Sequence, residues 1–272
     1  MYNLGGIEFA ARQLEGVFAF ILLDTDQRKV FLGRDTFGVR PLFRFATDDG
    51  FLAACSEAKG LIGLEKKGQT NSLPLSPFPP GHVETYELDS KGKVQLSKSL
   101  RFHRIGDMPL YHLPATPQAE LDVSANIRNL LQAAVQNRLM GGRRIGCLLS
   151  GGLDSSLIAA LLLRHAKGAG IQYPVQTYAI GMEGSPDVAA ARRVAKHIGS
   201  EHHEVIFTPS QGIEAIRDVI HALESYDITT VRASVGMFLV SKYISEKTDS
   251  VVLFSGEGAD ELCQVGSVTH WK

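Results

Sequence analysis

Cysteine is scarce in this chain of 272 residues, which has three, widely spaced at Cys55, Cys147 and Cys263. An odd number without a C-x-x-C pair argues against both a disulfide framework and a zinc site. Cys147 lies in an apolar run and is expected to pack in a core. His202 and His203 are also poor metal ligands, because neighbouring side chains of a strand point to opposite faces.

An excess of charge of one sign is also lacking, since the formal net charge is −1 and the isoelectric point is near 6.8. A chain without a basic surplus has no electrostatic footprint for a polyanion, which argues against nucleic acid as a partner. The longest apolar runs, residues 17–23 and 157–163, are far shorter than the roughly 20 residues that span a bilayer. Residues 1–6 show no secretory signal, so the cytosol is the expected compartment.

The first hundred residues carry closely spaced β signals and few helical ones. Residues 17–23 are apolar at every position, which predicts a strand covered on both faces, as in a layered sandwich. Asp49-Gly50 predicts a tight hairpin, because both positions of such a turn accept positive φ. A proline-rich stretch at residues 73–81 interrupts the pattern. The expected strands are residues 17–23, 29–32, 41–45, 51–55 and 82–88.

Beyond residue 120 the pattern changes to helical segments that alternate with short apolar runs. A polar, proline-containing stretch at residues 107–120 is the expected linker between two domains. The alternation that follows predicts a parallel, doubly wound sheet. The expected helices are residues 121–140, 155–167, 187–198, 210–223 and 231–247, and the expected strands are residues 144–149, 175–181, 201–207 and 251–254.

A glycine- and serine-rich loop, residues 150–156 (Ser-Gly-Gly-Leu-Asp-Ser-Ser), links an apolar run to a helical run. The glycines let the backbone approach a ligand, the serines offer donors, and the helix start presents unpaired N–H groups. Such a loop is typical of a pyrophosphate cradle. No Gly-Lys-Ser/Thr follows, which excludes a Walker loop and favours Asp154 as a ligand of Mg²⁺. A plain strand-turn-helix connection is the alternative.

A second loop, residues 255–261 (Ser-Gly-Glu-Gly-Ala-Asp-Glu), follows another apolar run at residues 251–254. In an open parallel sheet, loops at the carboxyl ends of strands converge on one crevice, where nucleotides bind. The two loops together therefore predict a site for ATP with Mg²⁺.

The chain resembles the glutamine-dependent asparagine synthetase family over about residues 5–262, which correspond to about the middle half of a full family member. The likeness rests on the two loops and on further motifs. These motifs are residues 14–20, 33–35 with 38–42, 56–59 and 226–234.

The resemblance implies a two-domain fold of the α/β and α+β classes. Residues 1–106 correspond to a partial glutamine amidotransferase domain, an antiparallel sandwich of the N-terminal-nucleophile (Ntn) glutaminase type. After the linker, residues 121–262 correspond to part of a Rossmann-like doubly wound parallel sheet of the ATP-pyrophosphatase (adenine nucleotide α hydrolase-like) type. Arg34 and Asp35 belong to the glutaminase sheet in the family, whereas the residues alone indicate a turn with a solvated ion pair.

The activity that the resemblance implies is ATP-dependent amide formation in asparagine biosynthesis. The side-chain carboxylate of aspartate attacks the α-phosphate of Mg-ATP, which gives β-aspartyl-AMP and pyrophosphate. Ammonia, derived from glutamine, then displaces AMP and gives asparagine. The first loop, its helix start and Mg²⁺ neutralise the charge on pyrophosphate.

The resemblance also implies roles for individual residues. Glu257 and Asp154 are catalytic, and Asp154 and Asp260 hold Mg²⁺. Thr229, Thr230 and Arg232 bind aspartate, although the residues alone favour a helix start with Thr230 as N-cap. The ATP-binding residues are Leu148, Ser150, Gly151, Gly152, Asp154, Ser155, Ser156, Ile180, Ser255 and Gly256.

Both ends of the chain depart from the family pattern. The family's glutaminase nucleophile is a cysteine at the mature amino terminus, whereas this chain begins Met1-Tyr2-Asn3, so no glutamine hydrolysis is expected. Cys55 is a poor substitute, because it has no free amine beside it. In the family a helical region with a catalytic lysine follows residue 262. Here residues 263–272 form an atypical tail of the kind that alternative splicing or an incomplete gene model produces.

Two other interpretations stay open. A β-lactam synthetase shares this layout, adenylates a carboxylate and needs no cysteine, but residues 229–232 favour the aspartate enzyme. A non-catalytic fragment that associates with full-length subunits belongs to another class of function. In either case the expected partners are small molecules, a second copy of the chain or a full-length subunit.

Overall fold

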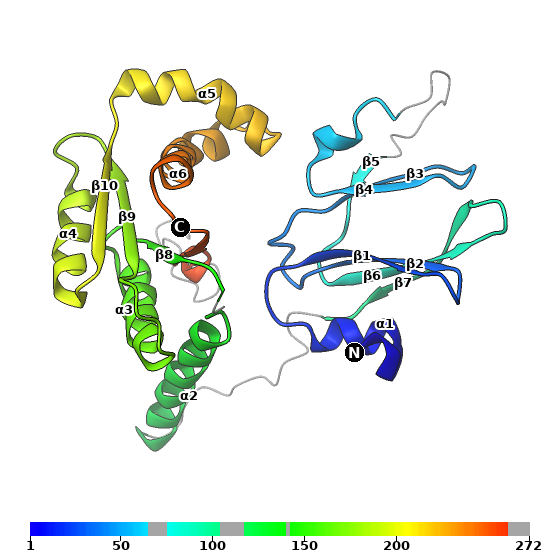
Figure 1. The fold of residues 1–272 in the computed structure, drawn as a ribbon, viewed down its shortest axis with the longest axis horizontal. Helices are drawn as coiled ribbons and strands as arrows, with labels where there is room; N and C mark the ends of the chain where they lie inside the picture. The colour runs from blue at the N-terminus through cyan, green and yellow to red at the C-terminus, as the bar shows by residue number, and fades with distance from the viewer. Residues whose placement is uncertain (65–74, 104–116, 140–141, 261–272) are drawn as a thin grey trace, which may run out of the picture. The chain divides into compact units, whose positions relative to one another are not determined.

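The computed structural model describes residues 1–64, 75–103, 117–139 and 142–260, with the backbone alone for residues 117–122. The chain divides into two compact units, Met1–Leu113 and Pro114–Lys272, each with its own sheets (Figure 1). The expected tail, residues 263–272, and most of the expected linker lie outside the described residues. Within the described ranges, no helix is both long and apolar enough to span a bilayer.

The first unit is an antiparallel sandwich. Its larger sheet has the strand order β1-β2-β6-β7, and its smaller sheet has the order β4-β3-β5. The elements are α1 (Tyr2–Gln13), β1 (Ala19–Asp24), β2 (Lys29–Arg34), β3 (Phe43–Ala46), β4 (Leu52–Cys55), the 3-10 helix η1 (Ala58–Leu61), β5 (Leu75–Pro77), β6 (His82–Leu88) and β7 (Val94–Arg101).

The core of this unit lies between its two sheets. Leu32 and Tyr86 of the larger sheet cluster there with Leu42 and Phe78, and all four are buried. Helix α1 packs on the other face of the larger sheet, where Ala11 is buried. The sandwich that the spacing of β signals predicts is therefore confirmed.

Strand β1 differs from its prediction, because only one of its faces is covered. Ile21 and Leu23 are each 56% exposed. β1 is at the edge of the larger sheet in the part of the chain described, and the smaller sheet packs over Leu32 and Tyr86 of the neighbouring strands. The expectation of a strand buried on both faces is wrong for β1, because the face that carries Ile21 and Leu23 is exposed.

Local sequence also misses several elements of this unit. The β3–β4 hairpin forms, but its connection spans residues 47–51, and of the Asp49-Gly50 pair only Gly50 has a positive φ, of 90°. Helix α1 was not expected, because it contains two glycines and is kinked at Gly6. Strand β7 was not expected either, since it is mostly polar and exposed and owes its place to pairing with β6. Strand β5 lies inside the proline-rich stretch.

Arg34 and Asp35 do not form the expected solvated ion pair. The Asp35 carboxylate is buried and accepts hydrogen bonds from the backbone N–H groups of Val39 and Arg40, both at 2.9 Å. The Arg34 guanidinium donates to the carbonyl oxygens of Gly38 at 2.6 Å and Arg40 at 2.8 Å. Both side chains therefore close the following loop through its backbone instead of pairing with each other.

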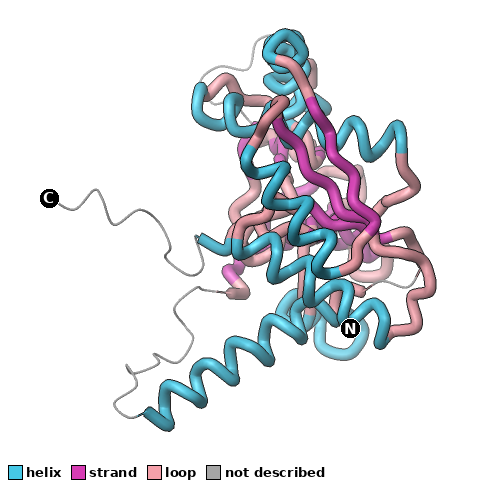
Figure 2. Tube along the Cα trace, turned by 90° about the vertical axis from the view of Figure 1, so that its left-hand side faces the viewer, coloured by secondary structure: helices cyan, strands magenta, loops and turns pink. Residues whose placement is uncertain are grey.

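The second unit contains a parallel sheet with the strand order β10-β9-β8-β11. Helices run along its strands (Figure 2). The doubly wound prediction is confirmed, and the observed bounds lie within a few residues of the expected ones. The elements are α2 (Pro117–Gln136), β8 (Ile145–Leu148), α3 (Leu153–Gly168), β9 (Gln176–Gly181), α4 (Pro186–Ile198), β10 (Glu201–Ile206), α5 (Pro209–Leu223), α6 (Ile228–Lys247) and β11 (Val252–Phe254).

Both faces of this sheet are covered by helices. On one face Leu162 of α3 and Ala191 of α4 pack with Cys147 of β8. On the other face Val240 of α6 packs with Tyr178 of β9. Cys147 is completely buried, and burial raises the pKa of its thiol to about 12, so it is the core residue that the sequence predicted.

The two adjacent histidines of β10 point to opposite faces, as predicted. His202 Nδ1 lies 2.9 Å from the Thr177 hydroxyl, whereas the His203 ring stacks on Tyr178 with 5.2 Å between ring centroids. They cannot converge on one ion.

Candidate functional site

The strand order of the parallel sheet reverses beside β8. The chain passes from β8 to β9 and β10 in one direction and then returns to place β11 on the other side of β8. At such a reversal the connections leave on opposite faces, and a crevice opens at the carboxyl ends of the strands on either side of it, here β8 and β11. The loops that follow β8 and β11 are the two loops that the sequence marks as a nucleotide site.

The first loop is held in shape by its own hydroxyl groups. Ser150 Oγ and Ser155 Oγ are 2.9 Å apart, and the Ser150 N–H donates to Ser155 Oγ at 3.2 Å. Helix α3 begins directly after Gly152, and no described side chain caps its start. Its first N–H groups and its positive dipole end are therefore available to an anion.

Two further features of this loop fit a phosphate ligand. Gly151 has a φ of +84°, and a methyl group there would lie 2.5 Å from the Ala191 nitrogen, so only glycine lets the loop pack against α4. Ser156 Oγ is buried and has no hydrogen-bond partner among the described residues. A buried hydroxyl without a partner costs free energy, which a ligand oxygen would recover.

The second loop packs directly on the first. A methyl group at Gly256 would lie 2.8 Å from the Ser155 nitrogen, so the two backbones touch where Gly256 lacks a side chain. The Ser255 hydroxyl accepts a hydrogen bond from the Glu257 N–H at 3.1 Å and shapes the turn. The expected convergence of the two loops is therefore observed.

A cavity of about 290 Å³ lies between the loops and extends along the sheet towards α6. Its lining combines the carboxylates of Asp154, Asp187, Glu257 and Asp260 with apolar side chains such as Leu148. The predicted site residues in the lining are Leu148, Ser150, Gly152, Asp154, Ser155, Ile180, Ser255, Gly256, Glu257 and Asp260.

Gly151 and Ser156 are not in the lining, and Gly151 packs against α4. Sequence reasoning missed Asp187, Met237 and Val240, which do line the cavity. The available signals were weak. Asp187 stands in the first turn of α4, as acidic residues often do. Met237 and Val240 are three residues apart on α6, but the sequence does not say which helix face meets the cavity.

The residues expected to bind aspartate lie elsewhere. Thr229 and Thr230 are exposed in the first turn of α6, and Arg232 lines an apolar groove between α5 and α6. The helix cap is Asp227, not Thr230 as the residues alone indicated. Its carboxylate accepts from the Thr230 N–H and hydroxyl, both at 2.8 Å, and these bonds lower the pKa of Asp227 below its ordinary 3.8.

The carboxylates of the cavity do not form a ready metal site. No group of three or more His, Cys, Asp or Glu among the described residues is arranged to hold an ion. Asp154 and Asp260 nevertheless both line the cavity, one from each loop. Two carboxylates suit Mg²⁺ when substrate phosphates and water supply the remaining oxygen ligands.

The chain has close relatives among known proteins. It is 61% identical to a glutamine-hydrolysing asparagine synthetase of Gallus gallus and 58% identical to that of Homo sapiens, in each case over 97% of this chain and 48% of the relative. It thus spans about half the length of the curated relatives it matches. An NH3-dependent NAD synthetase from Campylobacter jejuni is similar with a TM-score of 0.34 at 19% identity, over 54% of this chain and 61% of that chain.

Family models match both units. A glutamine amidotransferase domain model matches residues 1–63, and an asparagine synthase model matches residues 126–270, which contain both loops of the cavity. The latter match extends over more than half of the chain. This protein therefore belongs to the asparagine synthase family.

Proposed function

We propose that this chain forms the ATP-binding part of an asparagine synthetase that converts aspartate, ATP and ammonia or glutamine into asparagine, AMP and pyrophosphate. One observation carries the proposal. At the reversal of strand order two loops touch, and both contribute carboxylates to the same cavity, Asp154 from the first loop and Glu257 and Asp260 from the second. The family match supports the reaction.

In the first step a side-chain carboxylate oxygen of aspartate bonds to the α-phosphorus of ATP. The bond from that phosphorus to the bridging oxygen breaks, and its electron pair leaves with pyrophosphate. The start of α3 and the hydroxyls of Ser150 and Ser155, which line the cavity, bind the departing oxygens. Asp154 and Asp260 would hold Mg²⁺, which would supply neutralising charge near the phosphates.

In the second step the ammonia nitrogen bonds to the activated acyl carbon, and the carbon–oxygen bond to AMP breaks. The nitrogen must lose a proton. Glu257 lines the cavity beside Gly256 and is the proposed acceptor.

The remaining contacts divide between nucleotide and amino acid. Leu148 and Ile180 form the apolar wall for adenine, while Ser255 and Gly256 lie beside the ribose. Aspartate binding by Thr229, Thr230 and Arg232 rests on the family resemblance, since these residues lie outside the cavity lining. We place the protein in the cytosol.

A second candidate function is association with full-length subunits or with a second copy of the chain. Co-expression with an intact relative, followed by size-exclusion chromatography, tests it. Separate elution of the two chains would rule it out.

Titration calorimetry of the whole chain with ATP, with and without Mg²⁺, tests the leading proposal. We expect magnesium-dependent binding that Asp154→Ala weakens, because the variant loses one of the two carboxylates proposed to hold Mg²⁺. Asp218→Ala is the matched control, because Asp218 is an exposed carboxylate on α5 outside the cavity lining. Absent binding by the unaltered chain, or an equal loss in both variants, contradicts the proposal.

Asparagine formation provides a separate test of Glu257. Where the intact reaction is measurable, Glu257→Ala should lower asparagine formation while far-ultraviolet circular dichroism stays unchanged. An unchanged rate in a folded variant would remove Glu257 from its proposed role.

A further inference from the structure

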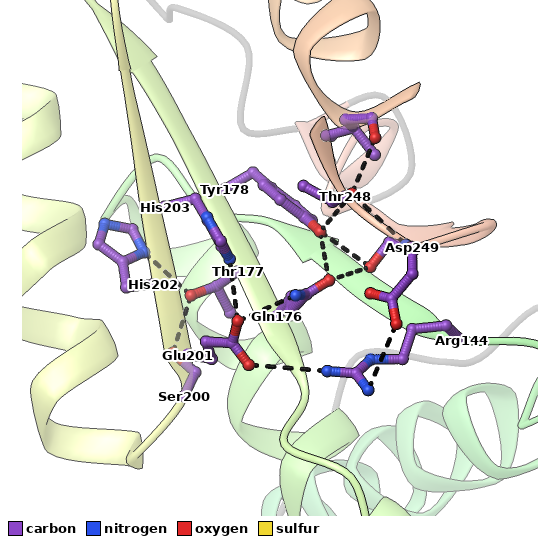
Figure 3. A network of polar contacts seen from close by, with 12 residues as sticks. Arg144, Gln176, Thr177, Tyr178, Ser200, Glu201, His202, His203, Thr248 and Asp249 are labelled. Carbon is purple, nitrogen blue, oxygen red and sulfur yellow. Dashed lines mark hydrogen bonds and ion pairs between the residues drawn. The ribbon is translucent and has the colours of Figure 1, made fainter. Parts of the chain in front are cut away.

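A buried polar cluster lies at the amino end of the parallel sheet, where β9 begins and the chain approaches β11 (Figure 3). Its centre is the hydroxyl of Tyr178, which is 1% exposed. This oxygen lies 2.7 Å from Gln176 Oε1, 2.8 Å from Ser250 Oγ and 3.1 Å from Thr248 Oγ1. Ser250 also donates to Gln176 Oε1 at 2.8 Å. The cluster therefore joins β9 to the segment between α6 and β11.

The arrangement is built into the sheet. A methyl group at Gly146 of β8 would lie 2.7 Å from the Tyr178 ring and 2.9 Å from Ser250 Oγ. Gly146 does not have a positive φ, so glycine is needed here only because a side chain would not fit. β8 thus lacks a side chain where the ring of Tyr178 and the hydroxyl of Ser250 pass over it.

Apart from this cluster, the segment is held by the N–H groups of Val251 and Val252, which donate to the Arg144 carbonyl, and by Phe254, which packs in the core. β11 (Val252–Phe254) pairs only with β8 among the described strands, through three residue pairs. Close to its start, Arg144 lies 3.6 Å from Asp249, which is largely exposed, so this ion pair contributes little. Gln176, Tyr178 and Ser250 are all buried, where hydrogen bonds hold a position more firmly.

Tyr178 is tied to both loops of the cavity. Its carbonyl oxygen accepts a hydrogen bond from the Leu149 N–H at 2.8 Å, directly before the first loop. Its hydroxyl holds Ser250, and Ser255 begins the second loop directly after β11. Only Val251 and the three residues of β11 separate Ser250 from Ser255. We therefore expect a shift at Ser250 to move the second loop relative to the first.

We propose that Tyr178 is a positioning residue for the nucleotide site, and that its hydroxyl, through Ser250 and Thr248, sets where residues 255–260 lie over the first loop. The inference deepens the proposed function and rests on it. The hydroxyl itself lies at the opposite end of the strands from the two loops, so it acts through β11.

Two variants remove the contact without adding bulk, Tyr178→Phe and Ser250→Ala. We expect each to weaken Mg-ATP binding about fivefold or more, and the double variant to lose much less than the product, because both remove the same contact. We also expect faster hydrogen exchange in the peptide that covers residues 252–260 in the absence of ligand.

Thr177→Val is the matched control. Thr177 is completely buried on the same strand, but its hydroxyl faces Ser200 and His202 on the other side of the sheet. We expect this variant to lower the unfolding temperature while Mg-ATP affinity stays within about twofold and exchange at residues 252–260 stays unchanged.

The outcomes separate this inference from the proposed function. Unchanged exchange at residues 252–260 in folded Tyr178→Phe and Ser250→Ala overturns the positioning role, whatever the chain binds. If the unaltered chain does not bind Mg-ATP, the proposed function fails, and local exchange alone decides the role of Tyr178. Equal losses of affinity in Thr177→Val would show that the cluster contributes only to the general stability of the unit, and would overturn the inference.

Discussion

The two loops of the cavity are built with unequal support. The first follows β8, which pairs with strands on both sides, and leads into a helix of 16 residues. Its serines bond to each other, and Gly151 packs against α4. The second follows β11, which has three residues and pairs on one side in the described part of the sheet. Its place depends on Phe254, which packs in the core, on the contact at Gly256 and on the distant cluster around Tyr178.

This difference shows that a symmetric-looking pair of sequence motifs need not be symmetric in stability. The first loop is fixed by the unit's core, so changes there should affect folding. The second is fixed by a few contacts, so changes there should affect the ligand more than the fold. Local stability of this kind varies widely within one protein.

The largest expected effect comes from breaking the first loop. Gly151→Ala adds a side chain to a left-handed residue and sets its methyl group 2.5 Å from a backbone nitrogen of α4. We expect the free energy of unfolding to fall by about 3 kcal/mol, measured by urea titration, with loss of Mg-ATP binding.

Gly184→Ala is its control, because Gly184 has a similar φ of +77° with nothing within 4 Å of the added methyl group. This variant should lose only about 1 kcal/mol. Equal losses at the two positions would show that backbone strain alone, and not packing against α4, makes glycine necessary in the first loop.

A smaller effect should follow from breaking the second loop. Gly256→Ala places a methyl group 2.8 Å from the Ser155 nitrogen, in a backbone conformation that alanine tolerates. The loop must move away, and we expect calorimetry to give about tenfold weaker Mg-ATP binding, or about 1.4 kcal/mol, with little change in unfolding free energy. A large loss of stability with unchanged affinity would reverse the comparison.

Strengthening the helix that leads to β11 should sharpen the comparison. Gly236 lies inside α6, and a methyl group there would meet only Ile180, at 3.8 Å. Gly236→Ala should raise the free energy of unfolding by about 0.5 to 1 kcal/mol, because alanine loses less backbone entropy in a helix. A lower midpoint in thermal unfolding would contradict this.

The smallest effect concerns pH. A hydrogen bond from Gln176, with further contributions from His203 and Arg144, holds the pKa of Glu201 below its ordinary 4.5. Because the folded state binds the proton less well than the unfolded state, this contribution is present above pH 4.5 and is lost as the pH falls below it.

Glu201→Gln removes that titration and keeps an acceptor for Gln176. We expect it to cost under about 1 kcal/mol at neutral pH, because Glu201 is partly exposed. Its unfolding free energy should also fall less steeply than that of the unaltered chain between pH 5 and 3. Identical slopes in the two proteins would show that Glu201 carries no pH-dependent stability.

The second unit was well predicted because its signals are local. Apolar runs of strand length alternate with helical segments, and glycine marks both loops, so the order of elements follows from the chain itself. In the first unit β7 and α1 were missed, because a polar strand and a glycine-containing helix form only through contacts with distant residues.

The site was predicted in part for the same reason. Ten of the predicted residues line the cavity; nine lie in or close before the two recognisable loops, and the tenth, Ile180, lies on β9. Met237 and Asp187 come from helices whose facing depends on packing, and Arg232 was expected near the ligand but lies in a groove between α5 and α6.

The amino-acid sequence by itself determined the kind of sheet, the two glycine-rich loops and the family, because spacing, glycine and small polar residues act over a few neighbouring positions. Tertiary structure alone decided that Gly256 touches Ser155, that Gly146 makes room for Tyr178, and that Ile21 is exposed on an edge strand. These facts depend on how segments far apart in the chain pack against one another, and a local sequence pattern does not determine the distance between such segments.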